Sequence, residues 1–195
     1  MLRAFIALEL PIEIQQRLAQ VTNQLKQELA GIPIRWVPAN NIHLTLMFLG
    51  DVSDSNLQMV KDNLVSEVVN HLPFEISVGG LGVFPSLQRP RVIWVGVEAP
   101  GELSAIQSGI EHRMIRLGYA GEGRPFSPHL TVGRVSRNAN ATEMRIISQV
   151  IQPAQVGFLG VVRVEQIHLF RSDLNSDGAV YTRILSAEME KKPST

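Results

Sequence analysis

The sequence contains no cysteine, few aromatic residues and no excess of charge of either sign. Without cysteine there are no disulfide bonds, thiolate nucleophiles or cysteine metal ligands. Basic and acidic residues number 18 each, so the formal net charge is zero. A nucleic-acid coat protein or a polybasic membrane anchor needs a large positive excess, and this balance argues against both. It still permits one small local site for an anion.

Long apolar runs are missing as well. The N-terminal stretch MLRAFIALELPIEI contains an early acid and a proline, and it lacks the apolar run and cleavage site of a signal peptide. We therefore expect a cytoplasmic protein without a membrane segment. At 195 residues the chain suits one domain, or one domain of two similar lobes, and no linker or low-complexity tract divides it.

One short motif occurs twice in the chain. Residues 43–46 read HLTL and residues 129–132 read HLTV, so both copies are His-x-Thr-x with apolar residues at the x positions. Turn formers precede each copy and large apolar residues surround it, which favours two strands. Because side chains alternate between the faces of a strand, each His shares a face with its Thr while the apolar residues point to a core. Two strands that each present a His and a Thr on one face predict two half-sites facing one groove.

A single histidine in an apolar strand is more often a structural residue than a catalyst. Packing gives no reason, however, for a His and a Thr together on two strands, so the duplication favours a functional site. The same alternation places Phe48 on the core face with Leu44 and Leu46. Trp36, Phe48 and Trp94 could each stack a nucleobase. Core packing is the simpler expectation for Phe48 and Trp94, which leaves Trp36 as the candidate for stacking.

Hydrophobic periodicity predicts the remaining elements. Apolar residues spaced by three or four predict helices at 13–30, from 53 or 54 to 72, at 102–117 and at 142–151. Besides the two motif strands, β-rich runs predict strands at 2–10, 35–37, 74–83, 91–98, 161–170 and 179–186. The turn at 175–178, NSDG, makes the last two a hairpin, and the tail 191–195 is expected to fray. This order favours an α+β protein over a doubly wound parallel sheet.

Taken together, these segments resemble the two-histidine phosphoesterase superfamily, and within it the RNA 2′,3′-cyclic phosphodiesterases, also known as 2′-5′ RNA ligase-like proteins. The resemblance runs over nearly the whole chain, through RAFIALELP, RWVPANNIHLTLMFLGDV, PFEISVGGLGVFPSLQRPRVIWVGV, RPFSPHLTVGRV and IHLFRSDLNSDGAVYTRI. It implies a bilobal α+β fold, with two pseudo-symmetric lobes of antiparallel sheet, helices on the outside and the motif strands facing a central groove. Residues 1–195 would form a single two-lobed phosphoesterase domain.

The resemblance also implies an activity, the hydrolysis of a 2′,3′-cyclic phosphate on RNA or a nucleoside to a 2′-phosphomonoester without metal or cofactor. By motif position, His43 corresponds to the proton donor and His129 to the proton acceptor. Thr45 and Thr131 correspond to the residues that hold the phosphate oxygens. The implied substrates are RNA ends or nucleotides with a cyclic phosphate, tRNA fragments among them, and we expect a monomer with no protein partner. Two imidazoles suit this chemistry, because near neutral pH one can be neutral and the other protonated.

Arg134 is harder to place. The family has a basic residue near the end of the second motif strand, suggested to touch the phosphate, and Arg134 stands at that position. Strict alternation from His129 puts Arg134 on the face opposite to the histidine. A bulge at Gly133 would turn Arg134 back to the face of His129. Three further arginines could line an RNA groove, although surface ion pairs are the simpler expectation for them: Arg35, Arg91 and Arg124.

Three other functions stay open from the sequence. The same chemistry run backward, with an RNA 5′-hydroxyl in place of water, would make a ligase that forms 2′-5′ linkages. A non-catalytic RNA-end binding module would keep the site without turnover, although the presence of both histidines argues against it. A metal hydrolase would need an acid beside the histidines, and neither motif supplies one on the same face.

Overall fold

The computed structural model describes residues 1–175 and 178–190, and its elements follow the predicted order except that two strands stand where one was predicted at 161–170. Within these residues the strands are β1 Leu2–Leu8, β2 Ile34–Trp36, β3 Leu44–Val52, β4 Phe74–Phe84, β5 Val92–Glu98, β6 His129–Val135, β7 Phe158–Val164, β8 Gln166–Asn175 and β9 Gly178–Glu188. The helices are α1 Ile12–Glu28, α2 Asp54–Val68, α3 Gly101–Arg116 and α4 Ala141–Ile151, with a 3-10 helix at Ala39–Asn41. The predicted turn residues Ser176 and Asp177 and the tail 191–195 lie outside the described residues. Across the described ranges, no helix has the length and apolar character to cross a membrane.

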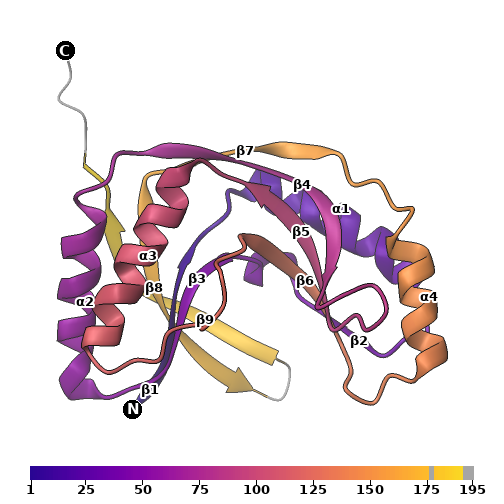
Figure 1. Ribbon diagram of the computed structural model, residues 1–195, viewed down its shortest axis with the longest axis horizontal. Coiled ribbons are helices and arrows are strands. Elements are labelled where there is room, and N and C mark those ends of the chain that lie inside the picture. The colour runs from indigo at the N-terminus through magenta and orange to yellow at the C-terminus, as the bar shows by residue number, and fades with distance from the viewer. Residues whose placement is uncertain (176–177, 191–195) are drawn as a thin grey trace.

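The nine strands of the described residues form one antiparallel sheet in the order β7-β4-β5-β6-β3-β1-β8-β9, with β2 paired to β6. The sheet curls into a half barrel with the helices on its outer side (Figure 1). Helices α2 and α3 pack against β3, β8 and β9, whereas α1 and α4 pack against β7 and β4. The predicted α+β class, antiparallel strands and external helices are confirmed, and the two lobes are halves of one continuous sheet.

The two halves of the sheet meet at the motif strands. Strands β3 and β6 share a single residue pair, Leu44 against Leu130, and both leucines are 0% exposed. Strand β2 pairs with the other end of β6, and the Val37 amide continues this contact by donating to the Val132 carbonyl at 2.9 Å. The first motif strand and the segment before it therefore line one edge of β6.

Residues 161–170, predicted as one strand, belong to two strands in different halves of the sheet. Strand β7 ends at Val164 and pairs with β4, whereas β8 begins at Gln166 and pairs with β1. Only Glu165 separates them. The prediction of one strand was wrong because β-branched and apolar residues keep the strand propensity high on both sides of Glu165. Periodicity does not report which neighbour each part pairs with.

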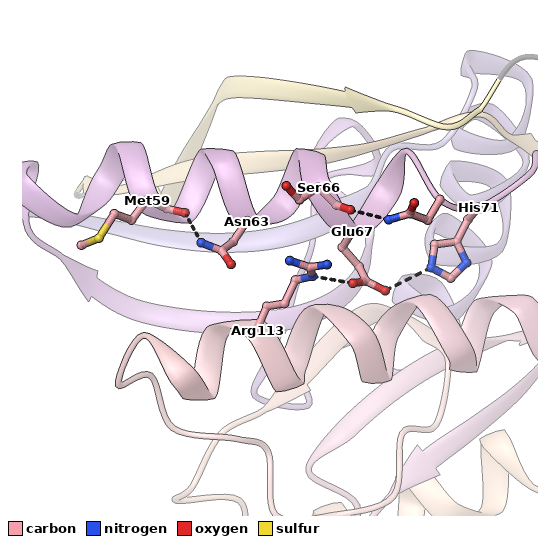
Figure 2. A network of polar contacts seen from close by, with 7 residues as sticks. Met59, Asn63, Ser66, Glu67, His71 and Arg113 are labelled. Carbon is pink, nitrogen blue, oxygen red and sulfur yellow. Dashed lines mark hydrogen bonds and ion pairs between the residues drawn. The ribbon is translucent and has the colours of Figure 1, made fainter.

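Polar side chains join α2 to α3 on the outer side of the sheet. Glu67 of α2 accepts hydrogen bonds from Arg113 of α3 and from His71 (Figure 2). Burial raises the pKa of Glu67, but the hydrogen bonds and charges of Arg113 and His71 outweigh it, so the pKa lies below its ordinary value. Gly109 of α3 leaves room for this carboxylate, because a Cβ there would come within 1.9 Å of Glu67 Oε1.

The burial of the two junction leucines yields a stability prediction. Leu44→Ala and Leu130→Ala should each lower the free energy of unfolding by about 2–5 kcal/mol, because each leaves a cavity in the core. Urea unfolding monitored by circular dichroism measures this. His129→Ala is the control, since His129 is only half-buried, and it should cost much less. Equal losses at His129 and Leu130 would show that the faces of β6 are assigned wrongly.

Candidate active site

Both His-x-Thr motifs lie on the sheet face that points away from the helices. The leucines between His and Thr point into the core, so by alternation Thr45 and Thr131 point to the other side, where each is half-buried. His43 immediately precedes β3, and His129 is the first residue of β6. We refer to the face that carries these four side chains as the motif face. Because β3 and β6 are antiparallel, His43 lies toward Thr131 and His129 toward Thr45.

The two histidines are held by the same backbone contact. Nδ1 of His43 lies 2.8 Å from the carbonyl oxygen of Asn41, and Nδ1 of His129 lies 2.7 Å from that of Ser127. A carbonyl oxygen only accepts, so Nδ1 carries the proton in both rings and donates it. This fixes the tautomer and leaves Nε2 as the nitrogen that can exchange a proton with a ligand.

Aromatic rings enclose His43. The Phe5 ring is stacked on the imidazole with centroids 4.6 Å apart and an interplanar angle of 27°. Tyr181 of β9 approaches edge-on at 5.2 Å and 86°. Phe5 belongs to a small apolar cluster on the motif face with Ala7 and Phe170, and Tyr181 packs against it. The surroundings of His43 are therefore built by the N-terminal strand and the C-terminal hairpin.

The pKa of His43 is lower than that of an ordinary histidine. Burial is the largest cause, because it disfavours the charged imidazolium, and the positive charge of Arg134 lowers the pKa further. The hydrogen bond to the Asn41 carbonyl opposes both effects. In the free protein His43 is therefore mainly neutral at pH 7.

His129 has a more open environment. The ring of Phe84 in β4 meets it at a centroid distance of 4.9 Å and an angle of 85°, and Phe84 in turn contacts Trp94 of β5 at 5.1 Å. The same four-residue motif thus places one histidine in an aromatic enclosure and the other beside a single aromatic pair.

One unpaired residue follows each motif. The register between β1 and β3 skips Leu46, and the register between β5 and β6 skips Val132. Two consecutive residues are therefore buried in each strand, and the alternation of faces shifts by one position.

The two bulges bring a further side chain from each strand to the motif face. Phe48, five residues after the first histidine, is 52% exposed, so its expected place in the core was wrong. Arg134, five residues after the second histidine, is exposed, and its charge acts on His43. The bulge that would return Arg134 to the side of the histidines is present, and it includes Gly133.

The two tryptophans are on the faces opposite to those expected. Trp94 pairs directly with Thr131 and so lies on the motif face. The sequence did not reveal this, because in RVIWVGVE either phase of the alternation places apolar residues in the core. Trp36 packs on the core side, where a Cβ on Gly133 would come within 3.0 Å of its ring. Gly133 therefore makes space for this indole.

Sequence reasoning did not single out the rings that surround the histidines, Phe5, Phe84 and Tyr181. No local signal marks them, because each reaches its histidine from a different strand. Of the other arginines, Arg91 donates to the Ser136 carbonyl at 2.7 Å and so has a structural role. In the part of the chain that the structure describes, no three His, Asp or Glu side chains gather as a metal-ligand set.

The chain is similar to known phosphoesterases. The family model described as LigT like Phosphoesterase matches residues 8–94, which include the first motif. RNA 2′,3′-cyclic phosphodiesterases of Methanothermobacter thermautotrophicus and Archaeoglobus fulgidus are 34% and 31% identical to the chain. Each alignment covers 92% of this chain, with 95% and 96% of the relative.

Solved structures show the same fold. A protein of Thermus thermophilus superposes with a TM-score of 0.78 at 26% identity, covering 95% of this chain and 97% of its own. The apo form of E. coli LigT gives a TM-score of 0.77 at 25% identity, covering 97% of this chain and 98% of its own.

The charge of Arg134 beside His43 yields a prediction. Arg134→Gln should raise the pKa of His43, because it removes a positive charge that disfavours the imidazolium. A pH titration of the His43 ring resonances by NMR measures the shift. Arg145→Gln is the control and should leave that pKa in place, since Arg145 is an exposed arginine of α4 on the outer side of the sheet. An unchanged pKa in the Arg134 variant would place Arg134 away from the histidine.

Proposed function

The chain belongs to the LigT-like phosphoesterase family, and from this membership and the geometry of its motif face we propose that it hydrolyses 2′,3′-cyclic phosphates on RNA or nucleotides to 2′-phosphomonoesters. The observation that carries the proposal is the pair of histidines on adjoining strands, each with Nδ1 donating to a carbonyl and Nε2 available. Relatives named RNA 2′,3′-cyclic phosphodiesterase cover most of the chain and support the substrate class.

In the proposed mechanism the two histidines divide the proton transfers. Nε2 of His129 takes a proton from water as the water oxygen bonds to phosphorus. The bond from phosphorus to the ribose 3′-oxygen breaks, and Nε2 of His43 gives its proton to that oxygen. Solvent then returns the pair to its starting protonation. Each positioned proton transfer contributes typically about 10²–10⁴-fold to the rate.

Three further side chains would stabilise the charge on the non-bridging oxygens. The hydroxyls of Thr45 and Thr131 lie on the motif face beside the histidines and can donate hydrogen bonds to them. Arg134 supplies a positive charge on the side of His43. Stabilisation of this kind is strongest where the groups are already held in place, and here all three are fixed on paired strands.

The low pKa of His43 means that substrate binding must restore its proton. A cyclic phosphate brings a negative charge close to the imidazole, which favours the imidazolium and opposes the effects of burial and of Arg134. Binding of substrate is thus coupled to uptake of a proton by the general acid.

We also propose that residues 1–195 act as a single two-lobed unit and as a monomer without protein partner or cofactor, on RNA ends that include tRNA fragments. The support is that the histidines, threonines and Arg134 of the proposed site all come from the two halves of one chain. Light scattering at the concentrations used for kinetics measures the molar mass, which should be that of one chain, 21.6 kDa.

Product analysis tests the proposed reaction. Adenosine 2′,3′-cyclic phosphate incubated with the protein and excess chelator should yield only adenosine 2′-phosphate. His43→Ala and His129→Ala should each lower kcat/KM by about 10²–10⁴-fold, because each removes one proton transfer. A 3′-phosphate product, or activity that disappears with chelator, would contradict the mechanism. An added RNA with a 5′-hydroxyl shows in the same assay how much cyclic phosphate is ligated instead.

The opposite roles of the two histidines predict a bell-shaped pH dependence of kcat/KM. A second proton on the pair removes the base, and loss of the only proton removes the acid, so the two limbs belong to the coupled pair. The phosphate charge stabilises the protonated pair, so the kcat profile should lie at higher pH than the kcat/KM profile. His129→Ala should abolish the acid limb. A rate that rises to a plateau at high pH would indicate a metal-bound hydroxide instead.

A further inference from the structure

Two positive charges lie side by side at one end of the motif face. Arg35 of β2 is the direct cross-strand partner of Arg134 of β6, and both side chains are exposed. Like charges placed directly opposite each other on neighbouring strands destabilise a sheet. Among the described residues neither guanidinium has a hydrogen bond or ion pair to the protein. The protein itself therefore supplies no anion to offset this repulsion.

The neighbours of Arg35 determine the face on which it lies. A Cβ on Gly133 would come within 3.1 Å of Ile34 and 3.0 Å of Trp36, so both of these side chains lie against Gly133 on the core side. Arg35 stands between them and by alternation points to the motif face, as does its partner Arg134. Neighbouring strands are about 4.8 Å apart, so Arg35 lies beside the arginine whose charge reaches His43, on the same edge of β6 as the first motif strand.

The chemistry of the proposed reaction determines where the rest of an RNA substrate lies. In phosphoryl transfer the attacking and leaving oxygens are roughly in line across phosphorus. His129 activates the water, so the leaving 3′-oxygen, and the ribose that carries it, lie on the side of His43. The RNA continues in the 5′ direction from that ribose. The next phosphodiester therefore lies at the end of the motif face that carries the two arginines.

We propose that Arg35, beside Arg134, binds the phosphodiester on the 5′ side of the terminal nucleotide, so that the enzyme distinguishes an RNA end from a mononucleotide. This proposal rests on the proposed function and on His43 as the acid. A phosphate near both guanidinium groups offsets their repulsion, and arginine binds phosphate oxygens with two parallel hydrogen bonds. At the other end of the motif face, the position equivalent to Arg134 is the uncharged Phe48. The paired positive charges are thus on the His43 side.

The test compares two substrates that differ by one additional 5′ adenosine and the phosphodiester that joins it. These are adenosine 2′,3′-cyclic phosphate and the dinucleotide ApA with a terminal 2′,3′-cyclic phosphate. For each, kcat/KM is measured at several concentrations of KCl with wild type, Arg35→Gln, Arg35→Lys and Arg145→Gln. Arg145 is an exposed arginine on helix α4, on the outer side of the sheet, so its variant controls for the change in net charge.

Wild type should prefer the dinucleotide, and Arg35→Gln should reduce that preference about tenfold, as expected for loss of a charged hydrogen bond. The plot of log kcat/KM against log salt for the dinucleotide should become shallower by about 0.7, the value for one phosphate contact in a single strand. Arg35→Lys should keep the salt slope, and Arg145→Gln should keep both quantities.

Equal effects of Arg35→Gln and Arg145→Gln, or a wild type without preference for the dinucleotide, would overturn the subsite. Retained preference and salt slope in Arg35→Gln would overturn it as well. In all three cases hydrolysis of the mononucleotide by wild type still supports the proposed function. Failure of wild type to hydrolyse either substrate would instead remove the proposed function itself, and with it the subsite.

Discussion

In a pleated strand every second side chain takes the same face, and a single unpaired residue reverses the order for everything that follows. Leu46 and Val132 are such residues, and each comes directly after the threonine of a motif. The composition of the motif face depends on them, because they turn Phe48 and Arg134 toward the histidines. Two strands with the same motif thereby contribute different third side chains, one aromatic and one cationic. The face has repeated acid–base residues but two chemically distinct ends.

The same motif also gives histidines of different character, and the difference comes from what packs around each. Both rings donate Nδ1–H to a carbonyl two residues earlier, so their orientation is fixed in the same way. His43 is enclosed by Phe5 and Tyr181, and a buried imidazole responds strongly to a nearby charge because little water screens it. His129 contacts Phe84 and is less enclosed. This difference supports the proposed roles, in which His43 gains its proton only with substrate bound and His129 is open to water.

The sequence was sufficient to predict the α+β class, the order of elements and both motif strands, because these depend on local periodicity and on a repeated pattern. It failed where the outcome depends on pairing between distant segments. Phe48 was assigned to the wrong face because a bulge leaves no local mark among apolar residues. The run through Glu165 was read as one strand, although its two parts pair with β4 and β1. The rings around His43 could not be found for the same reason, since they come from opposite ends of the chain.

The crossover at Glu165 also affects how the protein is made. Strand β7 completes one half of the sheet, and only then does the chain cross over to add β8 and β9 to β1 in the other half. Contacts between the first and last strands have large sequence separation, and such contacts form late because a long loop must close first. A growing chain on the ribosome therefore carries both histidines long before Phe170 and Tyr181 arrive to enclose the first of them. The pKa of His43 is therefore set only once β8 and β9 are in place, so a chain that lacks them has both histidines but not the surroundings that make the two differ.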